Sequence, residues 1–224
     1  MPKVSIGLPV YNGENFLKKA LSSILDQTFA DFELIISDNA SKDGTNEICE
    51  YFKNKDSRIK YYRNEENMGA AWNFNKVFQV AKGKYFKWAA HDDLLAPDFL
   101  VRCVDVLDRD SSVVLCQTEI QVIDESDNLI EGHQHGSDTT NEVLSNIDSF
   151  ETHLRFKDLI KFNHPCIDIF GLIRRDILAK TPLIAAYKGS DRNLLAELGL
   201  YGRLCRAPGN MFFSRKHPER SIEI

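Results

Sequence analysis

The chain has 224 residues, a hydrophobic content of 43% and a formal net charge of −5 at neutral pH. This composition is ample for a buried core and excludes a disordered chain. Because Lys and Arg are scattered and the global charge is negative, we expect no nucleic-acid partner.

The cysteines and the hydropathy of the chain set further bounds. Five widely spaced cysteines include no Cys-x-x-Cys pair that would indicate zinc or dithiol chemistry, so we expect reduced, mostly buried thiols in a cytoplasmic protein. No stretch approaches the ~20 apolar residues of a membrane span, and we expect no signal peptide before the first strand. Any membrane contact would then be peripheral.

The first hundred residues alternate between apolar runs and helical patterns. Strands are predicted at 3–9, 32–37, 59–63 and 85–90, and helices at 14–26, at 45–52 and from Asn67-Met68-Gly69 to just before Gly83. Trp72 in the last helix is expected in the core. This alternation predicts an α/β fold with a mostly parallel sheet covered on both faces.

The pattern changes after residue 107. A long strand is predicted at 113–123, and the polar turn 124–128 leads into a hairpin with Leu129-Ile130. A polar loop is expected at 132–146, where His133 and His135 suit a solvated loop better than a metal site. A helix at 150–162, a strand at 167–173 and a helix at 191–200 complete the predicted elements.

Polar residues follow three of the predicted strands. Pro9-Val10-Tyr11-Asn12 closes the first strand, residues 37–45 close the second, and His91-Asp92-Asp93 follows the fourth. Ligands of parallel sheets bind beyond the carboxyl ends of the strands, so these segments should meet in one crevice. Mg²⁺ and Mn²⁺ prefer oxygen ligands, and Mg²⁺ uses one or two protein carboxylates when phosphate oxygens supply others. The acidic pair therefore predicts a nucleotide-diphosphate ligand.

These motifs, in this order, resemble the family 2 glycosyltransferases of the GT-A fold, inverting enzymes that move a sugar from a nucleotide sugar to an acceptor hydroxyl. The resemblance is strongest over residues 4–100 and continues through Phe170-Gly171, Ser190-Asp191-Arg192 and His217-Pro218-Glu219-Arg220. It implies a Rossmann-like, mostly parallel central sheet flanked by helices, with a smaller C-terminal acceptor-binding portion. Residues 1–124 would bind the nucleotide sugar, and residues 125–224 of the same domain would bind the acceptor and carry the catalytic base.

The resemblance also implies which residues bind the nucleotide sugar. Asp38 would accept a hydrogen bond from a uracil or thymine N3–H, which favours UDP or dTDP donors. Capping of the following helix is the alternative role of Asp38 and Ser41. Relatives often carry an arginine where this chain has Ala70-Ala71. The implied set comprises Pro9, Tyr11, Asn12, Asp38, Asn67, Gly69, Asp92 and His217.

By matching position, Asp93 and His217 would bind a Mg²⁺ or Mn²⁺ ion, and Asp92 would contact the ribose or the water shell of the metal. The common Asp-x-Asp-Asp motif of the family would place a carboxylate at Ala90. Arg and Lys of segment 215–220 would offset phosphate charge. In the alternative interpretations, the acids cap the helix near Pro97 and segment 215–220 is a solvated tail.

Ser190-Asp191-Arg192 occupies the position of the family's catalytic base. Asp191 would remove the proton of the acceptor hydroxyl as its oxygen attacks the anomeric carbon, opposite the departing diphosphate. A helix N-cap is the alternative role. The loop 132–146 would order when the acceptor binds.

The resulting hypothesis is a metal-dependent, inverting glycosyltransferase of the hexosyltransferase type. By resemblance, it would act in surface polysaccharide or glycoconjugate assembly at the inner face of the membrane, on a carbohydrate or lipid-linked glycan acceptor. A dinucleotide-dependent dehydrogenase, a P-loop NTPase and a sugar nucleotidyltransferase each need a glycine-rich loop that the sequence lacks. The remaining rival is a non-catalytic sugar-nucleotide or carbohydrate-binding module with a degenerate metal motif.

Overall fold

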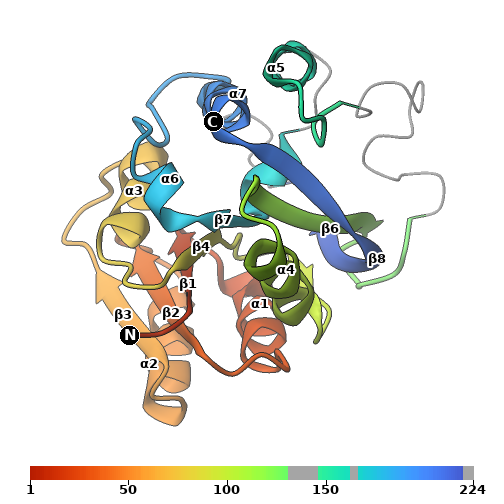
Figure 1. Ribbon diagram of the computed structural model, residues 1–224. Helices are drawn as coiled ribbons and strands as arrows, with labels where there is room; N and C mark the ends of the chain where they lie inside the picture. Colours follow the sequence, from red (N-terminus) through yellow and green to blue (C-terminus); the bar gives the residue numbers. More distant parts are fainter. Residues whose placement is uncertain (131–145, 162–165, 219–224) are drawn as a thin grey trace.

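The computed structural model describes residues 1–130, 146–161 and 166–218. Their centre is an eight-stranded sheet with the strand order β3-β2-β1-β4-β7-β6-β8-β5 (Figure 1). The predicted loop 132–146, apart from Asn146, lies outside the described residues, as do His133, His135, Phe162, Glu219 and Arg220. No helix of the described ranges is both long and apolar enough to cross a membrane.

The N-terminal half has the predicted alternation of strands and helices. The strands are β1 (Val4–Val10), β2 (Phe32–Asp38), β3 (Ile59–Arg63) and β4 (Tyr85–Trp88), and the helices are α1 (Glu14–Leu25), α2 (Thr45–Lys55) and α3 (Ala70–Gln79). All pairings among these four strands are parallel, as predicted. Helix α3 ends four residues before Gly83, which has a different role: a Cβ there would lie 2.6 Å from the backbone nitrogen of Ser5.

The C-terminal half of the sheet is mixed. Its elements are β5 (Leu94–Leu95), α4 (Phe99–Arg109), β6 (Val113–Ile123), α5 (Thr152–Leu159), the 3-10 helix η1 (Ile167–Phe170), β7 (Leu172–Arg174), α6 (Arg175–Leu178), α7 (Ser190–Tyr201) and β8 (Arg203–Arg215). Strand β7 runs antiparallel to both β4 and β6, whereas β8 runs parallel to β6 and antiparallel to β5.

Three C-terminal predictions need correction. The strand predicted at 167–173 is wrong in its first part, because the left-handed backbone of Cys166 (φ 51°) starts η1, and only Leu172–Arg174 pairs in the sheet. The helix predicted at 150–162 begins at Thr152 and ends at Leu159. Strand β8 was missed because Pro208-Gly209 in its middle indicates a turn, and the pairing with β6 accommodates it by register shifts.

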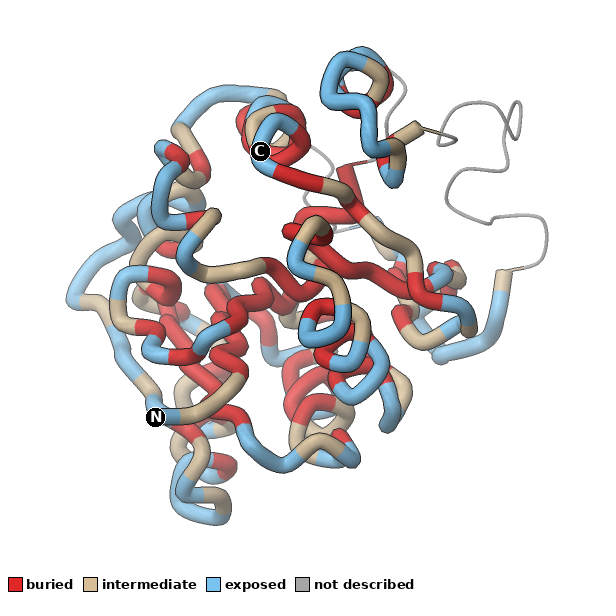
Figure 2. The backbone as a smooth tube through the Cα atoms, in the orientation of Figure 1, coloured by how far each residue is buried: buried red, intermediate tan, exposed pale blue. Residues whose placement is uncertain are grey.

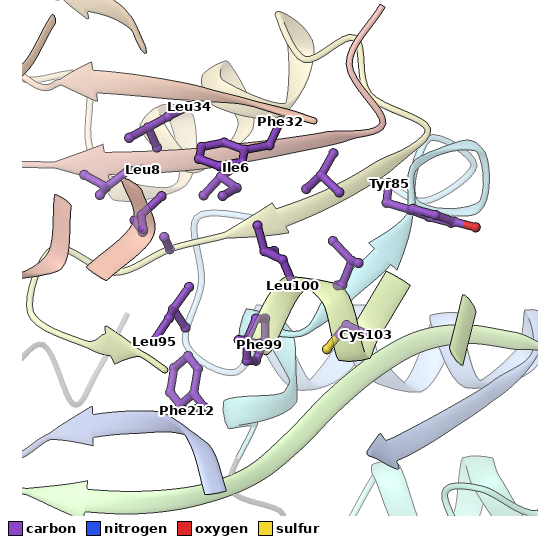
Figure 3. Packing of buried hydrophobic residues seen from close by; sticks show 14 of the residues in the cluster. Ile6, Leu8, Phe32, Leu34, Tyr85, Leu95, Phe99, Leu100, Cys103 and Phe212 are labelled. Atoms are coloured by element: carbon purple, nitrogen blue, oxygen red, sulfur yellow. The ribbon is translucent and has the colours of Figure 1, made fainter. Parts of the chain in front are cut away.

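Apolar side chains cover both faces of the sheet. Figure 2 shows the buried stretches of the backbone in red, and Figure 3 shows residues of one of the two clusters. Residues of α1, α2 and α4 pack on one face, and residues of α3, α6 and α7 pack on the other. Neighbouring strand residues alternate between the faces: Tyr85 belongs to the first cluster, and Phe86 and Trp88 belong to the second. Burial on both faces is typical of the parallel sheets of α/β proteins.

Two predictions about single residues have different outcomes. The expectation that Trp72 is in the core is wrong, because its side chain is 39% exposed and α3 buries Asn73 and Val77 instead. The prediction of mostly buried thiols is confirmed: four of the five cysteines are buried and Cys205 is half-buried.

Candidate active site

The loops after β1 and β2 are held together by hydrogen bonds at the carboxyl ends of these strands. The backbone N–H of Asn39 donates to the carbonyl of Val10 (2.9 Å), and the backbone N–H of Asn12 donates to Oγ of Ser41 (2.9 Å). Asn12 also accepts from the backbone N–H of Lys42 (2.9 Å) and has a left-handed backbone (φ 51°). Tyr11 beside it is 42% exposed, so this edge presents an aromatic ring to solvent. Pro9 is buried within β1.

Asp38 is completely buried at the end of β2. Its carboxylate accepts from the backbone N–H of Ser41 (2.8 Å) and from the hydroxyl of Tyr61 (2.9 Å), and it pairs with Nε of Arg63 at 3.4 Å. Burial and this hydrogen bond raise the pKa of Tyr61. Helix α2 begins after Gly44, so the alternative in which Asp38 and Ser41 cap this helix is wrong.

Relatives often carry an arginine at the position of Ala70-Ala71, and in this chain Arg63 places a guanidinium beside Asp38 instead. It lies opposite Asp38 in the β2–β3 register, and its side chain is 47% exposed. Both Tyr61 and Arg63 were missed in the sequence, although the alternation along the predicted strand 59–63 places these two residues on one face.

Asn39 links β2 to the start of α3. Its Nδ2 donates to Oδ1 of Asn67 (2.7 Å) and to the carbonyl of Gly69 (3.2 Å), while its Oδ1 accepts from the Met68 backbone N–H (2.9 Å). Gly69 has φ 87°, and open space surrounds the position of a Cβ there. Asn39 therefore holds the predicted residues Asn67 and Gly69 beside the end of β2. Asn39 itself was not predicted as a site residue.

The acidic pair lies beside the β1 loop. After β4, the backbone N–H of Ala89 donates to the carbonyl of Gly7 (2.8 Å) and keeps the chain along β1. His91 then packs against Gly13, where an added Cβ would lie 2.8 Å from its Cδ2. Burial lowers the pKa of His91, the charge of His217 adds to this, and the carboxylates of Asp92 and Asp43 oppose it.

Each acid of the pair contacts the end of β8. Nε2 of His217 lies 2.9 Å from Oδ2 of Asp92, and the backbone N–H of Arg215 donates to Oδ1 of Asp93 (2.9 Å). His217 is nearly buried and lies 4.7 Å from the ring of Phe16. The solvated-tail alternative is therefore wrong for His217. Helix α4 starts after Asp98, so the acids do not cap it either.

Arg215 corrects one expectation about the basic segment. It is completely buried, donates from Nε to the carbonyl of Asp92 (2.8 Å) and from Nη1 to the carbonyl of Asp124 (2.7 Å), and pairs with Asp127 at 2.6 Å. Its guanidinium also lies 4.8 Å from the Phe16 ring. Arg215 thus binds the acidic loop from within the core, and its buried guanidinium is not exposed to contact a phosphate.

The donor atoms fit a hard cation that takes most of its ligands from a substrate. Asp92 and Asp93 supply carboxylate oxygens, and His217 supplies a ring nitrogen. Within residues 1–130, 146–161 and 166–218, no group of three or more His, Cys, Asp and Glu side chains is placed to hold a metal ion. One or two carboxylates are the usual protein contribution to a Mg²⁺ that also binds phosphate oxygens.

Asp191 lies on a different element from the other predicted site residues. It is half-buried in the first turn of α7, where Gly189 occupies the N-cap position, so the N-cap alternative is wrong. Its carboxylate lies beside the thiol of Cys166, and burial together with the charge of Asp191 raises the pKa of Cys166 to about 12. Cys166 directly precedes η1, so Asp191 interacts with the start of this turn.

A comparison with protein families decides the assignment. The model of "Glycosyl transferase family 2" matches residues 5–181. The chain belongs to this family. An uncharacterized glycosyltransferase of Rickettsia typhi is 35% identical over 125 residues, covering 55% of this chain and 38% of that protein. A putative teichuronic acid biosynthesis glycosyltransferase of Bacillus subtilis is 35% identical over 106 residues, covering 47% of this chain and 42% of that protein. This family 2 chain thus spans about two fifths of the length of these curated relatives.

Solved structures of glycosyltransferases have the same fold as this family 2 chain. TarS of S. aureus, residues 1–349 in complex with UDP-GlcNAc, has a TM-score of 0.70 at 20% identity, covering 98% of this chain and 60% of that one. The mannosyltransferase PcManGT of Pyrobaculum calidifontis, in complex with GDP-Man and Mn²⁺, has a TM-score of 0.70 at 15% identity, covering 97% and 58%. The predicted GT-A fold is confirmed.

Proposed function

We propose that this chain is the catalytic domain of a metal-dependent, inverting glycosyltransferase that uses a nucleotide-diphosphate sugar. The observation that carries the proposal is a pair of hydrogen-bonded arrangements: one joins the loops after β1 and β2 around Asp38, and the other joins the end of β8 to the acidic pair. Family membership and the complexes of similar folds with UDP-GlcNAc and GDP-Man support it.

In this proposal the nucleoside lies along the ends of β1 and β2. Tyr11 offers an exposed ring, Asn12 an exposed amide, and Asp38 with Arg63 a charged pair at the base. A carboxylate accepts well from the N3–H of uracil or thymine, which favours UDP or dTDP over cytidine donors. Asn67 and Gly69 complete the donor side through Asn39.

Mg²⁺ or Mn²⁺ would be held by Asp93 and His217, and Asp92 would contact the ribose or the water shell of the ion. Such an ion, when bound, neutralises charge that develops on the leaving diphosphate. The backbone N–H of the buried Arg215 donates to the Asp93 carboxylate, and its Nε donates to the backbone carbonyl of Asp92, so Arg215 holds the acidic loop in place. Preorganised groups of this kind stabilise charge without reorganisation during the reaction.

Asp191 would accept the proton of the acceptor hydroxyl as its oxygen attacks the anomeric carbon. We further propose a carbohydrate or lipid-linked glycan as the acceptor, a role in surface polysaccharide or glycoconjugate assembly, and a cytoplasmic location with peripheral contact at the inner membrane face. The similarity to a putative teichuronic acid biosynthesis glycosyltransferase of Bacillus subtilis supports the role in polysaccharide assembly. Residues 1–124 would carry the donor site, and residues 125–224 the acceptor site and the base.

The first experiment is a thermal-shift screen of UDP-, dTDP- and GDP-sugars with and without Mn²⁺, because a ligand that binds only the native state raises the melting temperature. Donor hydrolysis is then measured for the stabilising donor in the wild type and in Asp191→Asn. Hydrolysis that disappears in the variant, with donor binding kept, is expected for the enzyme.

The alternative is a non-catalytic sugar-nucleotide or carbohydrate-binding module. Ala90, in place of a family carboxylate, favours it. Its signature is a donor-dependent thermal shift without any turnover in the wild type. No shift with any donor would contradict both functions.

A further inference from the structure

Lys87 is a charged residue in the middle of the hydrophobic core. It lies on the central strand β4 and has no exposed surface. Tyr85, two residues earlier, belongs to the core cluster that contains α1 and α4. Lys87 shares that face of the strand, because successive strand residues alternate between faces.

The ammonium of Lys87 has three partners from three different elements. It donates to the carbonyl of Phe170 at the end of η1, lies 4.7 Å from the ring centroid of Phe99 in α4, and lies 5.0 Å from that of Phe212 in β8. Figure 3 shows the two rings close together beneath the sheet. A carbonyl and two ring faces are favourable partners for a desolvated cation.

Burying this charge is nevertheless costly. Desolvation lowers the pKa of Lys87 to about 7, while the carboxylate of Asp93 and the thiol of Cys103 oppose the shift. An apolar side chain of the same length would fill the same space without this cost, and replacing buried ionic groups by packed apolar ones is often neutral or stabilising. Core packing alone therefore does not account for a lysine at this position.

Strand β4, which carries Lys87, and the segments of two of its three partners lead to candidate site residues. Strand β4 leads to Asp92 and Asp93, and Phe212 lies three residues before Arg215, whose backbone binds Asp93. Phe170 ends η1, which starts after Cys166, the residue beside Asp191. The ammonium thus contacts β8 and η1 together, alongside the stacked rings of Phe170 and Phe212 and the ion pair of Arg206 with Asp168.

We propose that Lys87 is a positioning residue: by binding the Phe170 carbonyl between the rings of Phe99 and Phe212, it fixes the η1 turn, and with it Asp191, relative to the acidic pair. This inference rests on the proposed function and deepens it. Lys87 touches neither donor nor acceptor, so its loss should affect the reacting geometry more than donor affinity. A misplacement of ~1 Å can lower the rate of a reaction by about 100-fold.

The test compares Lys87→Met with the wild type, using the donor that the wild type hydrolyses. We expect a melting temperature that is unchanged or higher, a donor KM within threefold of the wild-type value, and a kcat lowered at least tenfold. Lys84→Met is the matched control: it makes the same change three residues earlier, at a lysine whose side chain is 59% exposed and pairs with Asp108. This control should keep both kcat and KM.

A Lys87→Met protein that is stable and retains kcat within twofold of the wild type would overturn the inference. Equal losses of kcat in Lys87→Met and Lys84→Met would do the same. Should Lys87→Met not fold, Phe212→Leu keeps the ammonium and removes one ring face, and the inference then requires a lower kcat at constant KM. If the wild type turns over no donor, the proposed function is contradicted, and the positioning role, which depends on it, is contradicted as well.

Discussion

Nε2 of His217 lies 2.9 Å from Oδ2 of Asp92, although 125 residues separate the two along the chain. The pair is almost buried, with side chains that are 4% and 10% exposed. The contact joins the end of the last described strand to the acidic motif after β4.

His217→Ala should weaken UDP binding in the presence of Mn²⁺. The substitution removes the imidazole that contacts Asp92 and that we propose as a ligand of the ion, and we expect Kd to rise about tenfold, ~1.4 kcal/mol. Titration calorimetry with UDP and Mn²⁺ measures this change. His153→Ala is the control, because that imidazole is 74% exposed and distant in sequence from the site. If the two variants bind UDP with equal affinity, His217 does not contribute to donor binding.

Gly13→Ala should displace His91 and destabilise the protein. The new Cβ would lie 2.7 Å from Cγ2 of Val10 and 2.8 Å from Cδ2 of His91, and overpacking of this kind costs about 1–3 kcal/mol. Urea unfolding gives the free energy of unfolding. Gly44→Ala is the control, because its Cβ would meet only the flexible, exposed end of Glu14. If both variants lose the same free energy of unfolding, overpacking against His91 does not cause the loss in Gly13→Ala.

Asp38→Asn should change the preference between nucleotides. The amide loses the charge that accepts from the N3–H of uracil, but its NH₂ can donate to the N3 acceptor of cytosine. We expect UDP affinity to fall about tenfold, ~1.4 kcal/mol, and CDP affinity to fall less. Asp56→Asn serves as the control, since Asp56 pairs with Arg58 outside the candidate site. An unchanged ratio of the two affinities would exclude a base contact by Asp38.

The pH dependence of stability should include a contribution from His91. Its pKa is lowered in the folded protein, so the unfolded chain binds a proton first as the pH falls below the ordinary value of about 6.5. Unfolding is then favoured, and stability is lost towards acid by up to ~1.4 kcal/mol per pH unit. His91→Asn should lose less stability than the wild type between pH 7.5 and 5.5 in urea titrations. Parallel losses would assign the acid sensitivity to other groups.

The sequence was sufficient for the parallel half of the fold. Apolar runs of four to seven residues separated by amphipathic helices predicted β1 to β4 and the three helices between them. Because these strands are buried on both faces and connect through local crossovers, their pattern is carried by nearby residues. The polar residues at their carboxyl ends, including Asp38 and the acidic pair, followed from the same rule.

The mixed half depends on pairings that no local pattern contains. Strand β5 has two residues and exists only through its pairing with Phe212 and Phe213. Strand β8 contains Pro208-Gly209, a turn signal that pairing with β6 overrides. The burial of Arg215 and Lys87 was equally hidden, because a charged residue is expected at the surface until its distant partners are known.

Strand β8 lies between β6 and β5, and this order determines when the candidate site can form while the chain is being synthesised. Strand β5 and the acidic pair leave the ribosome more than a hundred residues before their partners on β8 do, and pairings of such long range form late and slowly. Until residue 215 has emerged, Asp93 lacks the backbone amide that orients it. A nascent chain would therefore remain inert towards the cell's activated sugars until its synthesis had passed this strand.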